Sequence, residues 1–162
     1  MTVGASAKVR MSPPPPGLMR LINPLVRRVL TAKPLGRHIE AVMLLEFAGQ
    51  RTGRVIRVPV ARHVIDGTVM AVTKRRWRLN FIGGAPVTVT HRGQIQHGHA
   101  FLVPATPDQV GAALRTALDN GSSPFILGLK ISRRYSPTVT DLAQIGASLV
   151  RLELETAQRS DP

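Results

Sequence analysis

The chain contains no cysteine, and it is poor in aromatic and acidic residues. The absence of cysteine excludes a disulfide framework and a metal site built from thiolates. Aromatic residues make up only 4% of the 162 residues, and they form no pattern of the kind that stacks single-stranded nucleic acid. No apolar run reaches the length of a membrane-spanning helix, and the N-terminus lacks the apolar core of a signal peptide. These absences predict a cytoplasmic protein that recognises no specific nucleic acid.

Acidic residues are scarce in a particular part of the chain. There are 9 acidic residues against 22 Lys and Arg, for a net charge of +13. The first acid is Glu40, and between Glu40 and Pro104 only Glu46 and Asp66 are added while Lys and Arg continue. A basic excess of this size favours anionic partners, namely a phosphorylated cofactor, a nucleic acid or the anionic inner face of a membrane.

The pattern along the chain predicts three segments. Residues 1–16 are basic and end in a run of four prolines, which predicts a disordered tail. Residues 17–39 carry apolar residues at helical spacing, which predicts an amphipathic helix. Its apolar face can pack on the domain, which is the commoner case, or lie peripherally on an anionic membrane surface to which the basic tail adds weak attraction. Residues 40–157 have the apolar content of one folded domain.

Alternating and apolar runs predict that this domain is mainly β, with helices inserted between strands. The expected strands are 42–48, 54–65, 68–73, 86–91, 94–103 and 150–154. Asp66-Gly67 marks a two-residue hairpin, and Pro59 predicts a bend, a bulge or a sheet edge. Short helices are expected at 74–82, after Thr106 and from Ser136-Pro137. About six antiparallel strands with such insertions predict an α+β domain built on a small barrel.

The stretch from Leu44 to Pro59 organises the domain, because it reads as a buried strand, a tight turn and a second strand. The residues of the turn are Gln50, Arg51, Thr52, Gly53 and Arg54. Guanidinium groups match the oxygen geometry of phosphates and carboxylates, so the turn favours an anionic ligand. The alternative is an ordinary hairpin with a solvated basic tip.

Two blocks of sequence resemble the deazaflavin (F420)-dependent nitroreductase and quinone reductase family of actinobacteria. The first block is the Leu-Leu-Glu run at 44–46, the Gly-Gln-Arg-Thr-Gly-Arg turn at 49–54 and the proline at 59. The second block is Trp77, Asn80 and the Val-Thr-Val run at 87–89. Both blocks lie in the family's order, and the resemblance covers roughly residues 40–105.

The resemblance implies a split β-barrel of the FMN-binding type that transfers a hydride from reduced coenzyme F420 to a small electrophile, such as a quinone or a nitro compound. The residues that it implies for cofactor binding are Gln50, Arg51, Thr52, Gly53, Arg54, Pro59, Lys74, Arg75, Trp77 and Asn80. The turn would hold the phosphate-bearing tail, and Pro59 would lie beside the deazaflavin ring. The sequence departs from the family's pattern in two places. Gln50 stands where the family usually has a basic residue, and residues 74–76 lead almost directly to Trp77, where many members have a Gly-Gly-Ala-Pro-like loop.

Other functions stay open at this point. FMN also carries a phosphate, so the two arginines of the turn do not distinguish it from F420. A cofactor-free barrel could bind a lipid or another small apolar ligand, and a nucleic-acid-binding protein is the alternative of a different class. Tyr135 is a candidate proton donor or a structural residue, and His97 with His99 is a candidate metal pair or a solvated pair. A homodimer is compatible with the resemblance.

Overall fold

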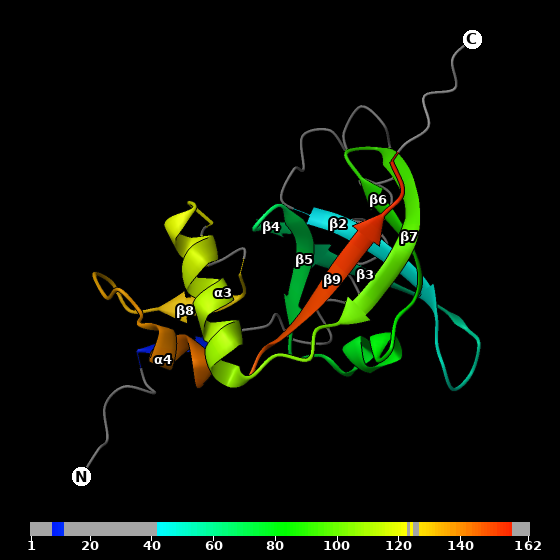
Figure 1. Cartoon of the computed structure of the whole chain (residues 1–162). Helices are drawn as coiled ribbons and strands as arrows, with labels where there is room; N and C mark the ends of the chain where they lie inside the picture. Colours follow the sequence, from blue (N-terminus) through cyan, green and yellow to red (C-terminus); the bar gives the residue numbers. More distant parts are fainter. Residues whose placement is uncertain (1–7, 12–41, 123, 125–126, 157–162) are drawn as a thin grey trace.

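The fold is given by a computed structural model that describes residues 8–11, 42–122, 124 and 127–156 (Figure 1). The predicted helix of residues 17–39 and most of the predicted tail lie outside the described residues. Among the described helices, none is long and apolar enough to cross a membrane.

Seven antiparallel strands form the main sheet, in the order β3-β2-β6-β7-β9-β5-β4. Their bounds are β2 Val42–Ala48, β3 Val55–Ala61, β4 His63–Ile65, β5 Thr68–Thr73, β6 Ala85–His91, β7 Gln94–Leu102 and β9 Ser148–Leu154. The predicted split β-barrel is confirmed, because these strands form a sheet that curls into a half-barrel, and the few helices occur between strands along the chain (Figure 1).

The connection between β3 and β4 explains the curl. The two strands are the opposite edges of the sheet, yet only Arg62 separates them in the chain. The sheet must therefore bend until its edges approach each other. The sequence predicted one continuous strand over 54–65, which was wrong, because the structure divides it into β3 and β4. The break falls at Arg62, while Pro59 stays within β3, where an edge strand tolerates its missing N–H.

Two tight turns set the register of neighbouring strands. Asp66-Gly67 joins β4 to β5 and Arg92-Gly93 joins β6 to β7, each as a two-residue loop. All four residues have positive φ, between 51° and 76°, which is the combination that a type I′ turn requires. The predicted Asp66-Gly67 hairpin is thereby confirmed.

Alternate residues of the strands fill the barrel. Met43, Leu45 and Phe47 of β2 are buried, and they pack with inward residues of β5, β6, β7 and β9. The 3₁₀ helix η1, Arg76–Phe81, closes one end of the barrel. The residues between these inward positions face the other side of the sheet.

A second layer covers the outer face of β4, β5 and β9 (Figure 1). It consists of β1 Val9–Met11, α3 Pro107–Asp119, β8 Leu129–Ile131 and α4 Val139–Ala143. The prediction that residues 1–16 are disordered is wrong for residues 9–11, which form β1, because Val9 is buried and pairs with Ile131. Its apolar partner lies more than a hundred residues away, so no local pattern indicated it.

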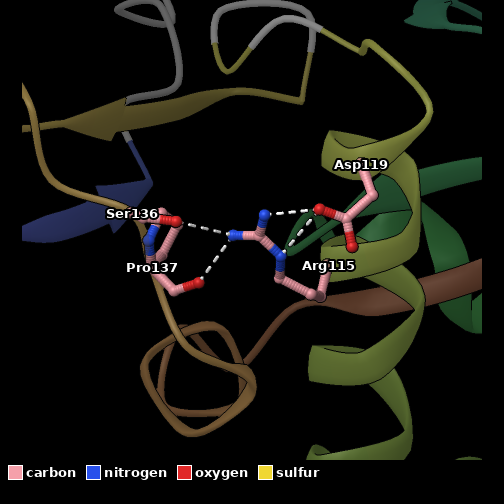
Figure 2. Close-up of polar contacts among 4 residues, drawn as sticks. All are labelled: Arg115, Asp119, Ser136 and Pro137. Carbon is pink, nitrogen blue, oxygen red and sulfur yellow. Dashed lines mark hydrogen bonds and ion pairs between the residues drawn. The ribbon is translucent and has the colours of Figure 1, made fainter.

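Capping boxes define where the two helices of this layer begin, and hydrogen bonds of Arg115 connect α3 to the segment before α4. Thr106 caps α3 through the predicted capping box with Gln109. The last helix begins at Val139, not at Ser136-Pro137, because Thr138 forms a second capping box with Asp141. Figure 2 shows the guanidinium of Arg115 donating to Asp119 and across to the Ser136 hydroxyl and the Pro137 carbonyl, at 3.2 and 2.9 Å.

His63 gives the fold a pH-sensitive position. The side chain is 3% exposed, and burial lowers the pKa of His63 to about 4, from an ordinary value near 6.5. Between these pH values the unfolded chain binds a proton that the folded chain does not. The free energy of unfolding should therefore fall by up to about 3 kcal/mol as the pH drops from 6.5 to 4. Thermal unfolding of wild type and His63→Leu at several pH values measures this difference.

The carboxylates provide an internal control for that experiment. Hydrogen bonds from the Thr138 backbone, Tyr135 and the Thr138 hydroxyl lower the pKa of Asp141. The stability that Asp141 contributes is therefore lost only as the pH falls below about 4. An equal loss between pH 6.5 and 4 in the His63→Leu variant would show that His63 is not responsible.

Candidate functional site

The turn between β2 and β3 is a compact loop whose amides are mostly used. The Gly49 and Gly53 amides donate within the turn, to Arg54 and Gly49 carbonyls at 2.9 and 2.8 Å. The Arg54 amide donates to Thr52 Oγ1 at 3.3 Å. Gly53 has φ of +67°, as a tight turn requires. Residues 49–54 have six backbone amides, and four of them donate hydrogen bonds within the protein when the Gln50 amide, described below, is included. Binding of an anion at this turn would therefore depend chiefly on side chains.

Gln50 ties this turn to η1. Its backbone amide donates to Asn80 Oδ1, and its side-chain Nε2 donates to the Asn80 carbonyl, both at 2.9 Å. Asn80 in turn donates from Nδ2 to the Trp77 carbonyl at 2.8 Å. Two residues of the turn and helix motifs are thus joined directly. Gln50, where the resembling family has a basic residue, holds two segments together here.

An aromatic cluster under η1 fixes the same end of the barrel. The ring centroids of Phe47 and Phe81 are 4.6 Å apart, and Trp77 lies about 6 Å from both. Phe81 is fully buried and Trp77 is half-buried. Edge-to-face packing of this kind orients η1 rigidly against β2. Trp77 therefore has a packing role in the barrel.

The link between Gln50 and Asn80 joins two basic segments of the chain. The turn contributes Arg51 and Arg54, and the segment before and within η1 contributes Lys74, Arg75, Arg76 and Arg78. No acidic residue occurs in the sequence between Asp66 and Asp108. The guanidinium of Arg78 donates to the carbonyls of Lys74 and Arg75, at 2.8 and 2.9 Å. We call these six residues the basic surface, and such a surface attracts anions.

Arg76 and Arg78 were not among the predicted site residues. The sequence shows four basic residues between positions 74 and 78, but of these the resemblance implied only Lys74 and Arg75. Of the predicted residues, Arg51, Thr52, Gly53, Arg54, Lys74 and Arg75 are exposed around this surface.

Pro59 lies farther along β3, away from the turn. Ile56, Val58 and Val60 pack toward the barrel core, so Val55 and Pro59 share the outer face. A groove of about 360 Å³ begins on that face at the base of the turn. Its lining includes Glu46, Val55, Thr88, His97 and His99. Glu46 is ion-paired with Arg57, so its charge is compensated.

The remaining candidates do not join the basic surface. Tyr135 lies in the second layer, where its hydroxyl donates to Asp141 Oδ2 at 2.7 Å. That hydrogen bond is the main cause that raises the pKa of Tyr135, which makes the hydroxyl a poorer proton donor. His97 Nδ1 lies 3.2 Å from Thr88 Oγ1. Within the described part of the chain, no group of three His, Asp or Glu is placed to hold a metal ion.

Removing Asn80 tests the link between turn and helix. Asn80→Ala deletes an acceptor for the Gln50 amide and a donor to the Trp77 carbonyl, whereas Gln50→Ala deletes only one hydrogen bond. Asn80→Ala should lower stability by about 1–2 kcal/mol, roughly 2–8 °C in melting temperature. Gln50→Ala should cost about half as much in the same calorimetric scan. Equal melting temperatures for Asn80→Ala and wild type would mean that water replaces the link.

Comparisons with known proteins give only distant likenesses. No protein-family model and no curated protein sequence matches the chain. Among solved structures, the conserved hypothetical protein Rv2991 from Mycobacterium tuberculosis is 13% identical, with a TM-score of 0.47 over 82% of this chain and 80% of that one. HutZ, the heme storage protein from Vibrio cholerae, is 12% identical, with a TM-score of 0.43 over 84% of this chain and 92% of that one. The assignment of the split barrel therefore follows from the strand order and register described above.

Proposed function

We propose that the chain binds a phosphate-bearing redox cofactor, reduced coenzyme F420, and uses it to reduce a small electrophile such as a quinone or a nitro compound. The observation that supports this most is the hydrogen-bonded link between Gln50 and Asn80, which joins the basic turn to the basic segment around η1. Phosphate oxygens fit such a surface, because charge-assisted hydrogen bonds from guanidinium groups are the strong ones.

Basic side chains would hold the phosphate-bearing tail of such a cofactor, because most backbone amides of the turn are already hydrogen-bonded within the protein. Arg51, Arg54, Lys74 and Arg75 would hold the phosphate, while Gly53 keeps the turn tight. The ring would lie on the outer face of β3 between Val55 and Pro59, where the groove begins. When bound, the reduced deazaflavin supplies the hydride, and the protein supplies binding and orientation.

The test is a titration of the full chain with F420 and, separately, with FMN, read by quenching of cofactor fluorescence. We expect saturable binding of F420 that weakens as salt is raised, because the phosphate contacts are charged. Tighter binding of FMN would move the proposal to a flavin-dependent protein of the same fold. Failure of both cofactors to bind at low salt would leave a cofactor-free barrel and would overturn the proposal.

A further inference from the structure

Leu44 and Thr90 are buried on the face of the sheet that points away from the barrel interior. They are partners on β2 and β6, and they are 4% and 7% exposed. Met43 and Leu45, on either side of Leu44, point into the barrel, so Leu44 points outward. Leu44 belongs to neither of the apolar clusters that fill the barrel and the second layer. Those clusters therefore do not account for its burial.

The burial of this outer face is confined to one end of β2 and β6. Glu46 and Thr88 are the next outward pair, and they have strand neighbours on both sides, as Leu44 and Thr90 do. The side chain of Glu46 is nevertheless 38% exposed, and Thr88 is only half-buried. Thr88 and Thr90 are the same residue type on one strand, so neighbouring strands cannot explain the difference. Something must lie over the sheet at the buried end.

The covered area is about as wide as one helix. Beyond Thr90, its β7 partner Ile95 is 64% exposed, and beyond Leu44, its β3 partner Pro59 is half-buried. Strands lie about 4.8 Å apart and a helix is about 10 Å across, so one helix covers two strands. The described helices lie elsewhere, since α3 and α4 belong to the second layer and η1 closes one end of the barrel.

The chain enters the sheet at the covered end, because β2 begins at Val42, two residues before Leu44. The segment that precedes it, residues 17–39, lies outside the described residues. Three peptide units join residue 39 to Val42, so their Cα atoms are at most about 11 Å apart. This segment can therefore reach Leu44 and Thr90 without a long connection.

The sequence of this segment fits such a cover. Leu21, Leu25 and Val29 recur every fourth residue, so they share one face of the predicted helix. A helix with one apolar face removes that face from water by packing it on a sheet. The two ends of the chain that also lie outside the described residues, 1–7 and 157–162, are short and have no such face.

From these observations we propose that residues 17–39 dock their apolar face on the outer surface of β2 and β6, over Leu44 and Thr90. The same face cannot lie on a membrane while it is docked, so the proposal decides between the two roles that the sequence leaves open for this helix. It does not depend on the proposed cofactor function.

The absence of cysteine allows a test with one thiol at a time in the full chain. Three successive residues of β6 supply the positions: Thr90→Cys under the proposed cover, Thr88→Cys on the same face beyond it, and Val89→Cys inside the barrel. The rate of modification by a thiol reagent measures how often each position opens to solvent. We expect Thr88→Cys to react at least about tenfold faster than the other two.

Substitutions in the segment identify the cover. Leu25→Ser together with Val29→Ser should raise the rate at Thr90→Cys at least about tenfold, because the loss of two buried apolar side chains favours local opening. The rates at Thr88→Cys and Val89→Cys should stay within about twofold, because the barrel itself does not open.

Arg27→Ser together with Arg28→Ser is the matched control. It also replaces two helix formers with serine, but it leaves the apolar face intact, so the rate at Thr90→Cys should not change. Vesicles of equal parts phosphatidylglycerol and phosphatidylcholine should not change this rate either, and nor should dilution of the protein, since the cover is part of the same chain.

Folding of each variant is checked by its melting temperature. The proposal is overturned if Thr90→Cys reacts as fast as Thr88→Cys, or if Leu25→Ser with Val29→Ser leaves its rate unchanged or raises the rate at Val89→Cys equally. Exposure of Thr90→Cys by vesicles would show that the helix prefers the membrane, and exposure by dilution would show that a second copy supplies the cover. Either result would also overturn the proposal. Because no step uses F420 or FMN, its failure says nothing about the cofactor site.

Discussion

Replacing Arg51 and Arg54 together with alanine should reduce the affinity for F420 at least about a hundredfold. A charge-assisted hydrogen bond contributes roughly 1.5–3 kcal/mol, so each single variant should lose about ten- to a hundredfold. The effect should come from the side chains, since four of the six turn amides are already hydrogen-bonded within the protein. Fluorescence titration of both single variants and of the double variant measures it.

A charge-matched control separates specific contacts from the general attraction of a basic protein. Arg133→Ala removes one exposed positive charge from the second layer, far in sequence from the turn. Affinity in this variant should change less than twofold at physiological salt, because screening weakens distant exposed charges. The melting temperatures of all variants should match that of wild type, since Arg51 and Arg54 are exposed. An unchanged affinity in the double variant would place the cofactor elsewhere.

Gly98→Ala should produce the largest loss of stability among single substitutions considered for this chain. Gly98 is buried on β7 opposite Leu154 of β9. A Cβ at this position would lie 2.1 Å from the Glu153 carbonyl oxygen and 2.8 Å from the Leu154 Cα. Both are backbone atoms of a paired strand, so relief requires β7 and β9 to separate. We expect a loss of about 3 kcal/mol or more, which is the upper range for overpacking.

The same substitution at Gly49 serves as the control. A Cβ there would lie 3.1 Å from the tip of the Ile56 side chain, which can rotate away, and at ordinary contact distances of 3.4 and 3.6 Å from Thr52 Oγ1 and the Arg54 carbonyl oxygen. Gly49→Ala should therefore change the free energy of unfolding by less than about 1 kcal/mol. Denaturant unfolding of the two variants gives the comparison. Equal stabilities would mean that the β7–β9 contact is looser than the structure shows.

Local signals predicted much of the fold, and long-range pairings account for what was missed. The strands Val42–Ala48 and Thr68–Thr73 were predicted with their observed bounds, because apolar patterning and turn residues mark them within a few positions. The three-residue strands β1 and β8 were not predicted, since each is too short to show alternation and exists only through the other. Neither Gly nor Pro marks the break between β3 and β4 at Arg62, because this break results from the curling of the sheet that brings its two edges together.

In the candidate site, too, the features that are local in sequence were predicted and the long-range contacts were not. The basic turn was predicted because its charges and Gly53 are contiguous in sequence. The hydrogen bonds from Gln50 to Asn80 join positions 30 apart, and sequence spacing does not reveal side-chain partners over that range.

The position of β9 has a consequence for how the chain is made. This strand is near the C-terminal end of the described residues, yet it lies between β7 and β5, and Val69 pairs with Leu152, 83 positions later. During synthesis, β5 and β7 each present an unpaired edge until residue 154 has left the ribosome. Such edges are templates for aggregation, and long-range pairing slows folding. The nascent chain therefore depends on β9 to become a barrel, and it is exposed to chaperones and misassembly until β9 has been synthesised and has paired.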